Sequence, residues 1–144
     1  MYLGVKKMSQ NDMSNKVSDI NGKQKLDIRQ RRKLQHELKC YMEQYFKAML
    51  GKGVDYTKVV IFEDVLLIRG EGFLTEPELH IVKTEAGHKV VRAARMEVAR
   101  QHAEENIPYF EELLQAKVIH QTNDIEAENN FWMHTIIFDR ILTE

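Results

Sequence analysis

Hydrophobic and polar positions alternate with two different periods along the chain, and the changes of period predict the order of its elements. From about Lys25 to Leu50, apolar residues recur every three or four positions, which is typical of an amphipathic helix. This stripe comprises Leu34, Leu38, Tyr41, Met42, Tyr45 and Met49. The sequence Gly51-Lys52-Gly53 predicts the end of the helix, because glycine readily adopts the left-handed conformation common after a helix.

Two short β-forming runs follow, Lys58–Phe62 and Val65–Arg69, and Glu63-Asp64 separates them. A two-residue polar connection between such runs predicts a tight hairpin. Neither run alternates cleanly between apolar and polar residues, so we expect apolar side chains on both faces of the hairpin. The second face then requires a cover, and the long helix and a second subunit are the two alternatives.

A helical pattern returns at residue 75. Thr75 and Glu78 are spaced as a capping box, and Pro77 suits a first helical turn. The helix is predicted to run to about residue 103, with a bend at Gly87. We expect 106–108, which contains a proline, to interrupt it before a short further helix.

The chain ends in a second predicted hairpin, residues 118–142, with its turn around 127–130. The order helix, hairpin, helices, hairpin predicts an α+β domain with a four-stranded, mainly antiparallel sheet. We assign residues 23–144 to this single domain. Residues 1–22 are polar and lack a sustained period, which predicts a flexible N-terminal arm. Phe131–Phe138, like the first hairpin, has apolar residues at both odd and even positions, so both faces of the sheet are expected to be apolar. A second copy of the chain would cover the exposed face, which predicts a homodimer.

The composition indicates a soluble, cytoplasmic protein. The chain has 144 residues, of which 43% are hydrophobic and 30% charged, and it contains one cysteine. This length suits one domain without a disulfide staple. No apolar run reaches the ~18–20 residues of a membrane span, and the apolar stretch at the start is too short for a signal peptide.

Charge is unevenly distributed, although the net charge is only −1. Residues 1–40 carry 10 Lys and Arg against 4 Asp and Glu, whereas residues 41–144 carry 11 against 18. The exposed face of the first helix offers a candidate partner surface, and a solvated helix face is the alternative. Its basic residues are Lys25, Arg29, Arg32 and Lys33. The acidic remainder, and the lack of aromatic residues among these cations, disfavour nucleic acid as the partner.

Several ordered motifs carry a resemblance to a known family. They are Gly51-Lys52-Gly53, residues 72–78, Thr84-Glu85-Ala86-Gly87 and residues 91–95, followed by Asn123-Asp124-Ile125. The chain resembles the MpsC-like family of small bacterial proteins over roughly residues 34–139. It departs from that pattern at Val54, where the family usually has proline, and at Gln115-Ala116, where it tends to have Thr-Gly. The family is named for a bacterial system that generates membrane potential by moving sodium and supports bicarbonate supply.

Three residues are candidates for ligand binding: Arg95, Glu78 and Asp124. Arg95 follows the apolar stripe, so it is expected at the edge of the core, where a guanidinium suits a carboxylate, bicarbonate or phosphate. An internal ion pair of Arg95 with Glu78 or Asp124 is the alternative. Glu78 has the chemistry of a general acid or base, yet helix capping also explains it.

No motif in the sequence indicates a particular reaction, cofactor or metal. His120 and His134 are expected to face each other if the last turn centres on Ala127, but a zinc site wants three or four protein ligands. We assign no catalytic residue, and whether the chain is an enzyme stays open. The resemblance implies a non-enzymatic accessory or regulatory protein that contacts a membrane ion or bicarbonate transport system. The alternative is a small-anion or metabolite-binding protein, or an enzyme, that uses Arg95 and nearby carboxylates.

Overall fold

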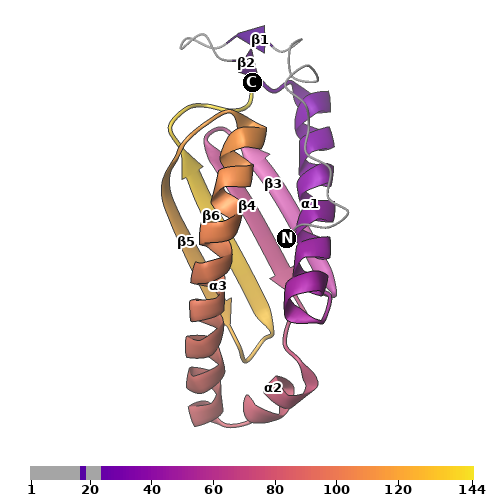
Figure 1. The fold of residues 1–144 in the computed structure, drawn as a ribbon, viewed down its shortest axis with the longest axis vertical. Helices are drawn as coiled ribbons and strands as arrows, with labels where there is room; N and C mark the ends of the chain where they lie inside the picture. Colours follow the sequence, from indigo (N-terminus) through magenta and orange to yellow (C-terminus); the bar gives the residue numbers. More distant parts are fainter. Residues whose placement is uncertain (1–16, 19–23) are drawn as a thin grey trace.

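The computed structural model describes residues 17–18 and 24–144 and confirms the α+β prediction (Figure 1). The helices are α1 (Ile28–Leu50), α2 (Glu76–Ile81) and α3 (Glu85–Leu114). The main sheet consists of β3 (Tyr56–Phe62), β4 (Val65–Glu71), β5 (Val118–Glu126) and β6 (Phe131–Phe138), and two short strands, β1 (Val17–Ser18) and β2 (Gln24–Lys25), pair with each other. The predicted arm, residues 1–22, lies outside the described residues except for β1.

The main sheet is antiparallel throughout and has the order β3-β4-β6-β5. Both predicted hairpins are confirmed, and their inner strands, β4 and β6, pair at the centre of the sheet. Glu63 in the first turn and Asn130 in the second have positive φ angles of 53° and 54°. The first loop consists of only two residues, since β3 ends at Phe62 and β4 begins at Val65, as the spacing predicts.

The first helix begins three residues later than predicted because Asp27 caps it. The Asp27 carboxylate accepts a hydrogen bond from the backbone N–H of Gln30, and the Gln30 side chain accepts one from the N–H of Asp27. Lys25 accordingly lies in β2 rather than in the helix. The buried stripe is as predicted except that Phe46 is buried and Met49 is 43% exposed. Gly51 ends the helix with φ 71°, the left-handed conformation that glycine allows.

The predicted single helix from residue 76 to 103 is wrong, because it divides into α2 and α3. Thr84 caps the second helix by accepting a hydrogen bond from the N–H of Gly87. A Cβ atom on Gly87 would lie 1.7 Å from the carbonyl oxygen of Ile81, so glycine allows the two helices to meet closely. The break predicted at residues 106–108 is also wrong. Pro108 is exposed, and the burial of Tyr109 and the residues after it holds α3 on the core.

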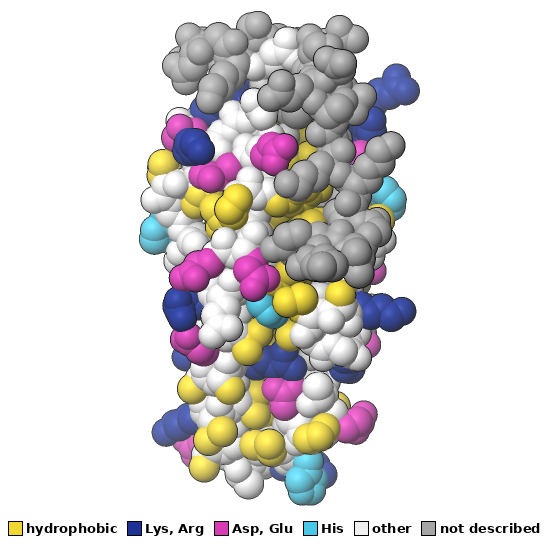
Figure 2. Space-filling model, in the orientation of Figure 1, with side chains coloured by type: hydrophobic (Ala, Val, Ile, Leu, Met, Phe, Trp, Pro, Cys, Tyr) yellow, Lys and Arg dark blue, Asp and Glu magenta, His cyan; other side chains and the backbone are white. Residues whose placement is uncertain are grey.

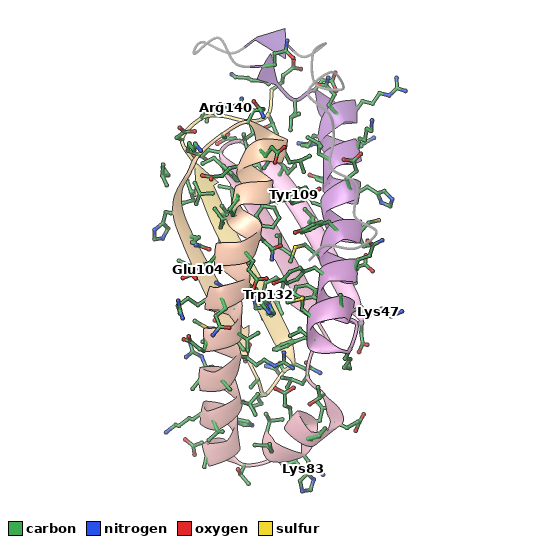
Figure 3. All side chains as sticks on the ribbon, in the orientation of Figure 1. Lys47, Lys83, Glu104, Tyr109, Trp132 and Arg140 are labelled. Carbon is green, nitrogen blue, oxygen red and sulfur yellow. The ribbon has the colours of Figure 1, made fainter. Side chains whose placement is uncertain are left out.

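Both long helices cover the same face of the sheet, α1 over β3 and α3 over β5 (Figure 1). Tyr41 of α1 stacks on Tyr109 of α3 with ring centroids 4.2 Å apart. Phe46 of α1 meets Trp132 of β6 edge to face at 5.1 Å. Tyr109 and Trp132 point into the layer between helices and sheet (Figure 3). The alternative in which the first helix covers the second face of the sheet is therefore wrong.

The C-terminal segment is tied to the end of α3 by a buried arginine, Arg140. Its guanidinium donates hydrogen bonds to the carbonyl oxygens of Leu114 (2.8 Å) and Gln115 (2.9 Å). It also donates to the carbonyl oxygen of Gln24 at 3.1 Å. A cation at this position satisfies carbonyls that the helix leaves without an internal partner and complements the helix dipole.

Candidate functional site

Arg95 and Glu78 form an ion pair where α2 and α3 meet. Arg95 Nε donates to Glu78 Oε2 at 2.7 Å, and Arg95 Nη2 donates to Glu78 Oε1 at 2.5 Å. The guanidinium also donates from Nη2 to the carbonyl oxygen of Phe73 and lies 5.4 Å from the centre of the Phe73 ring. Such a two-pronged pair fixes the angle between the two helices as well as contributing energy.

The same carboxylate completes the cap of α2. Thr75 donates from both its backbone N–H and its hydroxyl to Glu78 Oε1, each at 2.9 Å, and the Thr75 hydroxyl accepts from the N–H of Glu78. Burial alone would raise the pKa of Glu78, but the hydrogen bonds from Arg95 and Thr75 outweigh it and hold this pKa below its usual range. Glu78 is therefore an ionised anchor shared by Arg95 and Thr75.

Asn130 holds the loop that leads into this cap. Its side-chain oxygen accepts hydrogen bonds from the backbone N–H groups of Phe73 and Leu74, both at 2.9 Å, and its carbonyl oxygen accepts one from Gly72. In the sequence, Asn130 is identifiable only as a residue of the predicted turn. Its neighbours give no indication that its side chain reaches another loop, because that contact spans 56 residues.

The structure brings Arg95 and Glu78 together and leaves Asp124 apart from them. Asp124 lies opposite Met133, on the face of the sheet that points away from the helices, whereas Ile125 and Trp132 point toward them. The expectation that His120 and His134 face each other is wrong, since His120 lies opposite Ile137 and His134 opposite Asn123. The two histidines consequently point to opposite faces.

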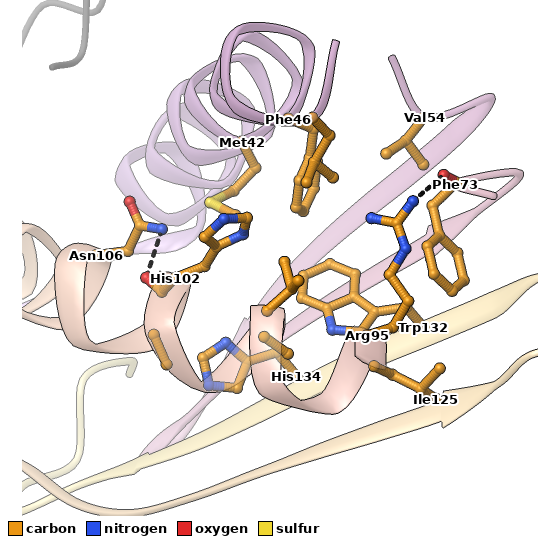
Figure 4. A pocket seen from close by; sticks show the side chains of 14 residues that line it. Met42, Phe46, Val54, Phe73, Arg95, His102, Asn106, Ile125, Trp132 and His134 are labelled. Carbon is orange, nitrogen blue, oxygen red and sulfur yellow. Dashed lines mark hydrogen bonds between the residues drawn. The ribbon is translucent and has the colours of Figure 1, made fainter. Parts of the chain in front are cut away.

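A hollow lies in the seam between α1 and α3, above the sheet (Figure 4). Figure 2 shows hydrophobic side chains gathered along this seam. Trp132 and Ile125 come from the sheet, Met42 and Phe46 from α1, and Arg95 is at one end. The lining residues are mostly apolar, and His102, Asn106 and His134 add polar groups.

Both histidines of the hollow are held in the neutral form. Burial lowers the pKa of His134 to about 4, and its Nε2 donates to the side-chain oxygen of Gln121 at 2.6 Å. Burial also lowers the pKa of His102; nearby Glu105 opposes this shift and Arg95 reinforces it. The His102 ring lies edge-on to Tyr45, with centroids 5.0 Å apart. These imidazoles can donate or accept hydrogen bonds at neutral pH without carrying charge.

The face of the sheet away from the helices, here called the open face, carries apolar side chains on β3, β4 and β6 and has no cover among the residues the structure describes. The register places its side chains in rows across the strands. Phe62 is 58% exposed and Tyr56 47% exposed, while the central positions are half-buried by their neighbours. The apolar members of the open face are Tyr56, Val60, Phe62, Val65, Leu67, Phe131, Met133 and Ile137.

The outer side of α1 is basic. Arg29, Arg32 and Lys33 are exposed, and none of them forms an ion pair with a described residue. Lys47 continues this side near the end of the helix (Figure 3). Lys25 is half-buried in β2, so it precedes the helix rather than belonging to this face.

Within residues 17–18 and 24–144, no group of three or more His, Cys, Asp and Glu side chains lies close enough to hold a metal ion. No helix in the same ranges combines the length and apolar character that a bilayer crossing requires. Cys40 and His36 are exposed neighbours, with Sγ and Nε2 3.6 Å apart.

Comparison with known proteins identifies relatives. Residues 30–140 match the sequence model of the family described as "Na+-translocating membrane potential-generating system (MpsC)". The "Uncharacterized protein YrhF" of Bacillus subtilis (strain 168) is 30% identical over 110 residues, which is 76% of this chain and 90% of that protein. No solved structure matches the chain. The match covers all of α3, the main sheet and nearly all of α1.

Proposed function

The chain belongs to the MpsC family, and we propose that it is an accessory protein of the sodium-translocating system for which that family is named. We place it at the cytoplasmic side of the membrane, where it acts through contacts with other proteins. Two surfaces support this role: the open face of the sheet and the basic outer side of α1. They lie on opposite sides of the molecule, so both can be occupied at once.

The observation that carries the proposal is the open face. An exposed apolar surface across three adjacent strands is typical of a protein interface. A second copy of the chain is the occupant that its charges favour. The register puts Lys58, Arg69, Met133 and Asp124 in one row, with the cation Lys58 on β3 and the anion Asp124 on β5. Arg69 between them is already paired with Glu71 on its own strand.

The row of charges also favours one arrangement of the two copies. A two-fold axis parallel to the strands lays β3 of one protomer over β5 of its partner. Lys58 then faces the partner's Asp124, and Arg69 faces Met133 of the partner subunit. Aligned sheet packing of this kind brings the two sheets about 10 Å apart at about 30° to each other. The opposite choice, an axis across the strands, would lay β3 of one protomer over β3 of its partner and bring the two Lys58 side chains to the same edge of the interface.

Charge exchange tests this arrangement. Lys58→Glu and Asp124→Lys each place like charges opposite one another, so each weakens the dimer by sedimentation or light scattering. The double variant restores opposite charges and is expected to recover most of the lost association. A double variant as weak as the sum of the two single variants would contradict the arrangement.

The basic side of α1 supplies the contact with the membrane system in this proposal. Dimerisation through the open face leaves α1 of each protomer outward, so its cations can meet acidic segments of a membrane protein. The test uses host cells that lack the gene and measures sodium-dependent membrane potential with a potential-sensitive dye. Wild-type protein is expected to restore the potential, and a variant with Arg29→Glu, Arg32→Glu and Lys33→Glu is expected not to restore it.

The matched control reverses three exposed cations elsewhere, Lys83→Glu between α2 and α3 and Lys89→Glu and Arg92→Glu on α3. It makes the same change in net charge and is expected to restore the potential fully. Thermal melting checks that both variants fold. Equal restoration by the α1 variant and the control would contradict a role for the basic side of α1. An unchanged potential in cells without the gene would contradict the accessory role itself.

A further inference from the structure

The hollow between α1 and α3 exists because α3 changes the size of its buried residues along its length. At one end of the seam Tyr109 and Phe110 fill the space against Tyr41. At the other end, Ala99 and Ala103, one turn apart, line the hollow with Trp132. Two small side chains at these positions leave space that larger apolar residues would otherwise close.

The space is large enough for more than a trapped water molecule. The hollow has a volume of about 40 Å³, whereas one water molecule requires ~10–15 Å³. Phe46 stands perpendicular to Trp132, at an interplanar angle of 88°, so the walls offer both an aromatic face and an aromatic edge. A flat apolar ring suits walls of this kind.

The charges of the residues that line the hollow determine whether a bound molecule can itself be charged. Glu78 already neutralises Arg95 through the Nε and Nη2 atoms. Asn106 donates to the carbonyl oxygen of His102 and accepts from the Tyr41 hydroxyl, so its amide is engaged on both sides. His102 is half-buried and lines the hollow with a neutral imidazole. An ionised ligand would lose its hydration here without gaining a free counter-charge.

We propose that this hollow binds a small uncharged molecule with one ring and one hydrogen-bonding group. The ring lies against Trp132 between Phe46 and Ala99, and the polar group meets the imidazole of His102. This inference stands apart from the accessory role, since it uses the helix-covered face and neither the open face nor the basic side of α1. It also differs from anion binding at Arg95, because the guanidinium stays with Glu78.

Trp132 is the only tryptophan of the chain, so its fluorescence reports occupation of the hollow directly. The probes are benzamide and benzoate, which share a ring and differ in charge. Benzamide is expected to change Trp132 emission saturably and to raise the melting temperature. Benzoate is expected to bind at least about tenfold more weakly because its charge must be desolvated. The absence of a saturable change, or equal binding of the two probes, would overturn the proposal.

A cavity-filling variant locates the binding. Ala99→Leu occupies the hollow and is expected to abolish the response to benzamide, and Ala99→Val, a smaller addition, is expected to weaken it. Ala93→Leu, at an exposed position of the same helix, is the matched control and is expected to bind like the wild type. Melting curves establish that each variant is folded. Benzamide binding that survives in folded Ala99→Leu would place the site elsewhere and overturn the proposal.

Discussion

The two faces of the main sheet are built from the same strands and both carry apolar side chains, yet only one is covered by the helices. On β4, Leu66 is 0% exposed beneath the helices, whereas the next residue, Leu67, is half-buried on the open face. Ile136 and Ile137 on β6 repeat the contrast. The absence of alternation in these strands therefore does not mean that one domain buries both faces. One face is covered by the helices, and the other stays partly exposed, which is the face that we propose for association.

Leu66→Ala and Leu67→Ala test this contrast with the largest expected effect. Leu66→Ala removes methyl groups from a filled core and is expected to cost about 2–5 kcal/mol of unfolding free energy. Leu67→Ala is expected to cost less than about 1 kcal/mol in dilute protein and to weaken association instead. Denaturant titration at two protein concentrations separates the effects. Equal losses in dilute protein would show that another part of the chain buries the open face.

Histidine burial on the helix-covered face predicts a pH dependence. With a pKa of about 4 in the folded protein against 6.5 normally, His134 stays neutral while the unfolded chain takes up a proton. The unfolded state therefore binds more protons between these values, and stability falls as the pH is lowered from 6.5 toward 4. The loss from His134 is about 3 kcal/mol.

His134→Gln is expected to flatten this dependence, measured by denaturant titration across pH 4–7. His80→Gln, at an exposed histidine outside the core, serves as the control and should keep the wild-type dependence. His102, whose pKa is also lowered, contributes a loss of the same sign and leaves some residual slope. A profile that His134→Gln leaves unaltered would show that His134 is not buried as the structure places it.

Arg95→Ala is expected to cost on the order of 2 kcal/mol, because it strips Glu78 of its counter-charge at the junction of α2 and α3. Arg92→Ala removes an exposed arginine of the same helix and is expected to be nearly neutral. Urea titration of both variants at neutral pH makes the comparison. Similar costs would mean that the Arg95–Glu78 pair contributes no more than an ordinary surface charge.

The smallest expected effect is at Thr75, whose hydroxyl caps α2. Thr75→Ala is expected to lower the unfolding free energy by on the order of 1 kcal/mol, while Thr75→Ser, which keeps the hydroxyl, is expected to recover most of it. Denaturant titration measures both. If Thr75→Ala left the unfolding free energy unchanged, the Thr75 cap would not stabilise this junction, and the Glu78 carboxylate would be its main stabilising group.

Local patterns predicted the order of elements and both hairpins because those depend on neighbouring residues. They failed where a contact between distant residues determines the structure. The close approach of Gly87 to Ile81 separates α2 from α3, and the burial of residues after Pro108 keeps α3 continuous past this proline. Periodicity also placed Met49 in the core, although Phe46 occupies that side of α1. Which face of a two-sided apolar strand is covered depends on where both helices pack, and no local pattern records it.

The candidate site was also predictable only in part, because some of its contacts are between neighbouring residues and others are between distant ones. The spacing of Thr75 and Glu78 predicted a capping box, and the apolar stripe before Arg95 predicted that Arg95 lies at the edge of the core. The pairing of Arg95 with Glu78 was one of two alternatives that spacing left open. The hollow was invisible in the sequence, since it arises where Ala99 and Ala103 meet Trp132 across a distance no motif encodes.

The molar mass in solution, measured by light scattering over a range of protein concentrations, tests most directly whether the open face is an interface. The chain has a mass of 17.0 kDa, so a dimer through the open face predicts roughly 34 kDa at micromolar concentration and above. Leu67→Lys, which buries a charge in that interface, is expected to shift the mass toward the monomer while remaining folded. A mass of 17.0 kDa at every concentration, for the wild type as for Leu67→Lys, would contradict the account.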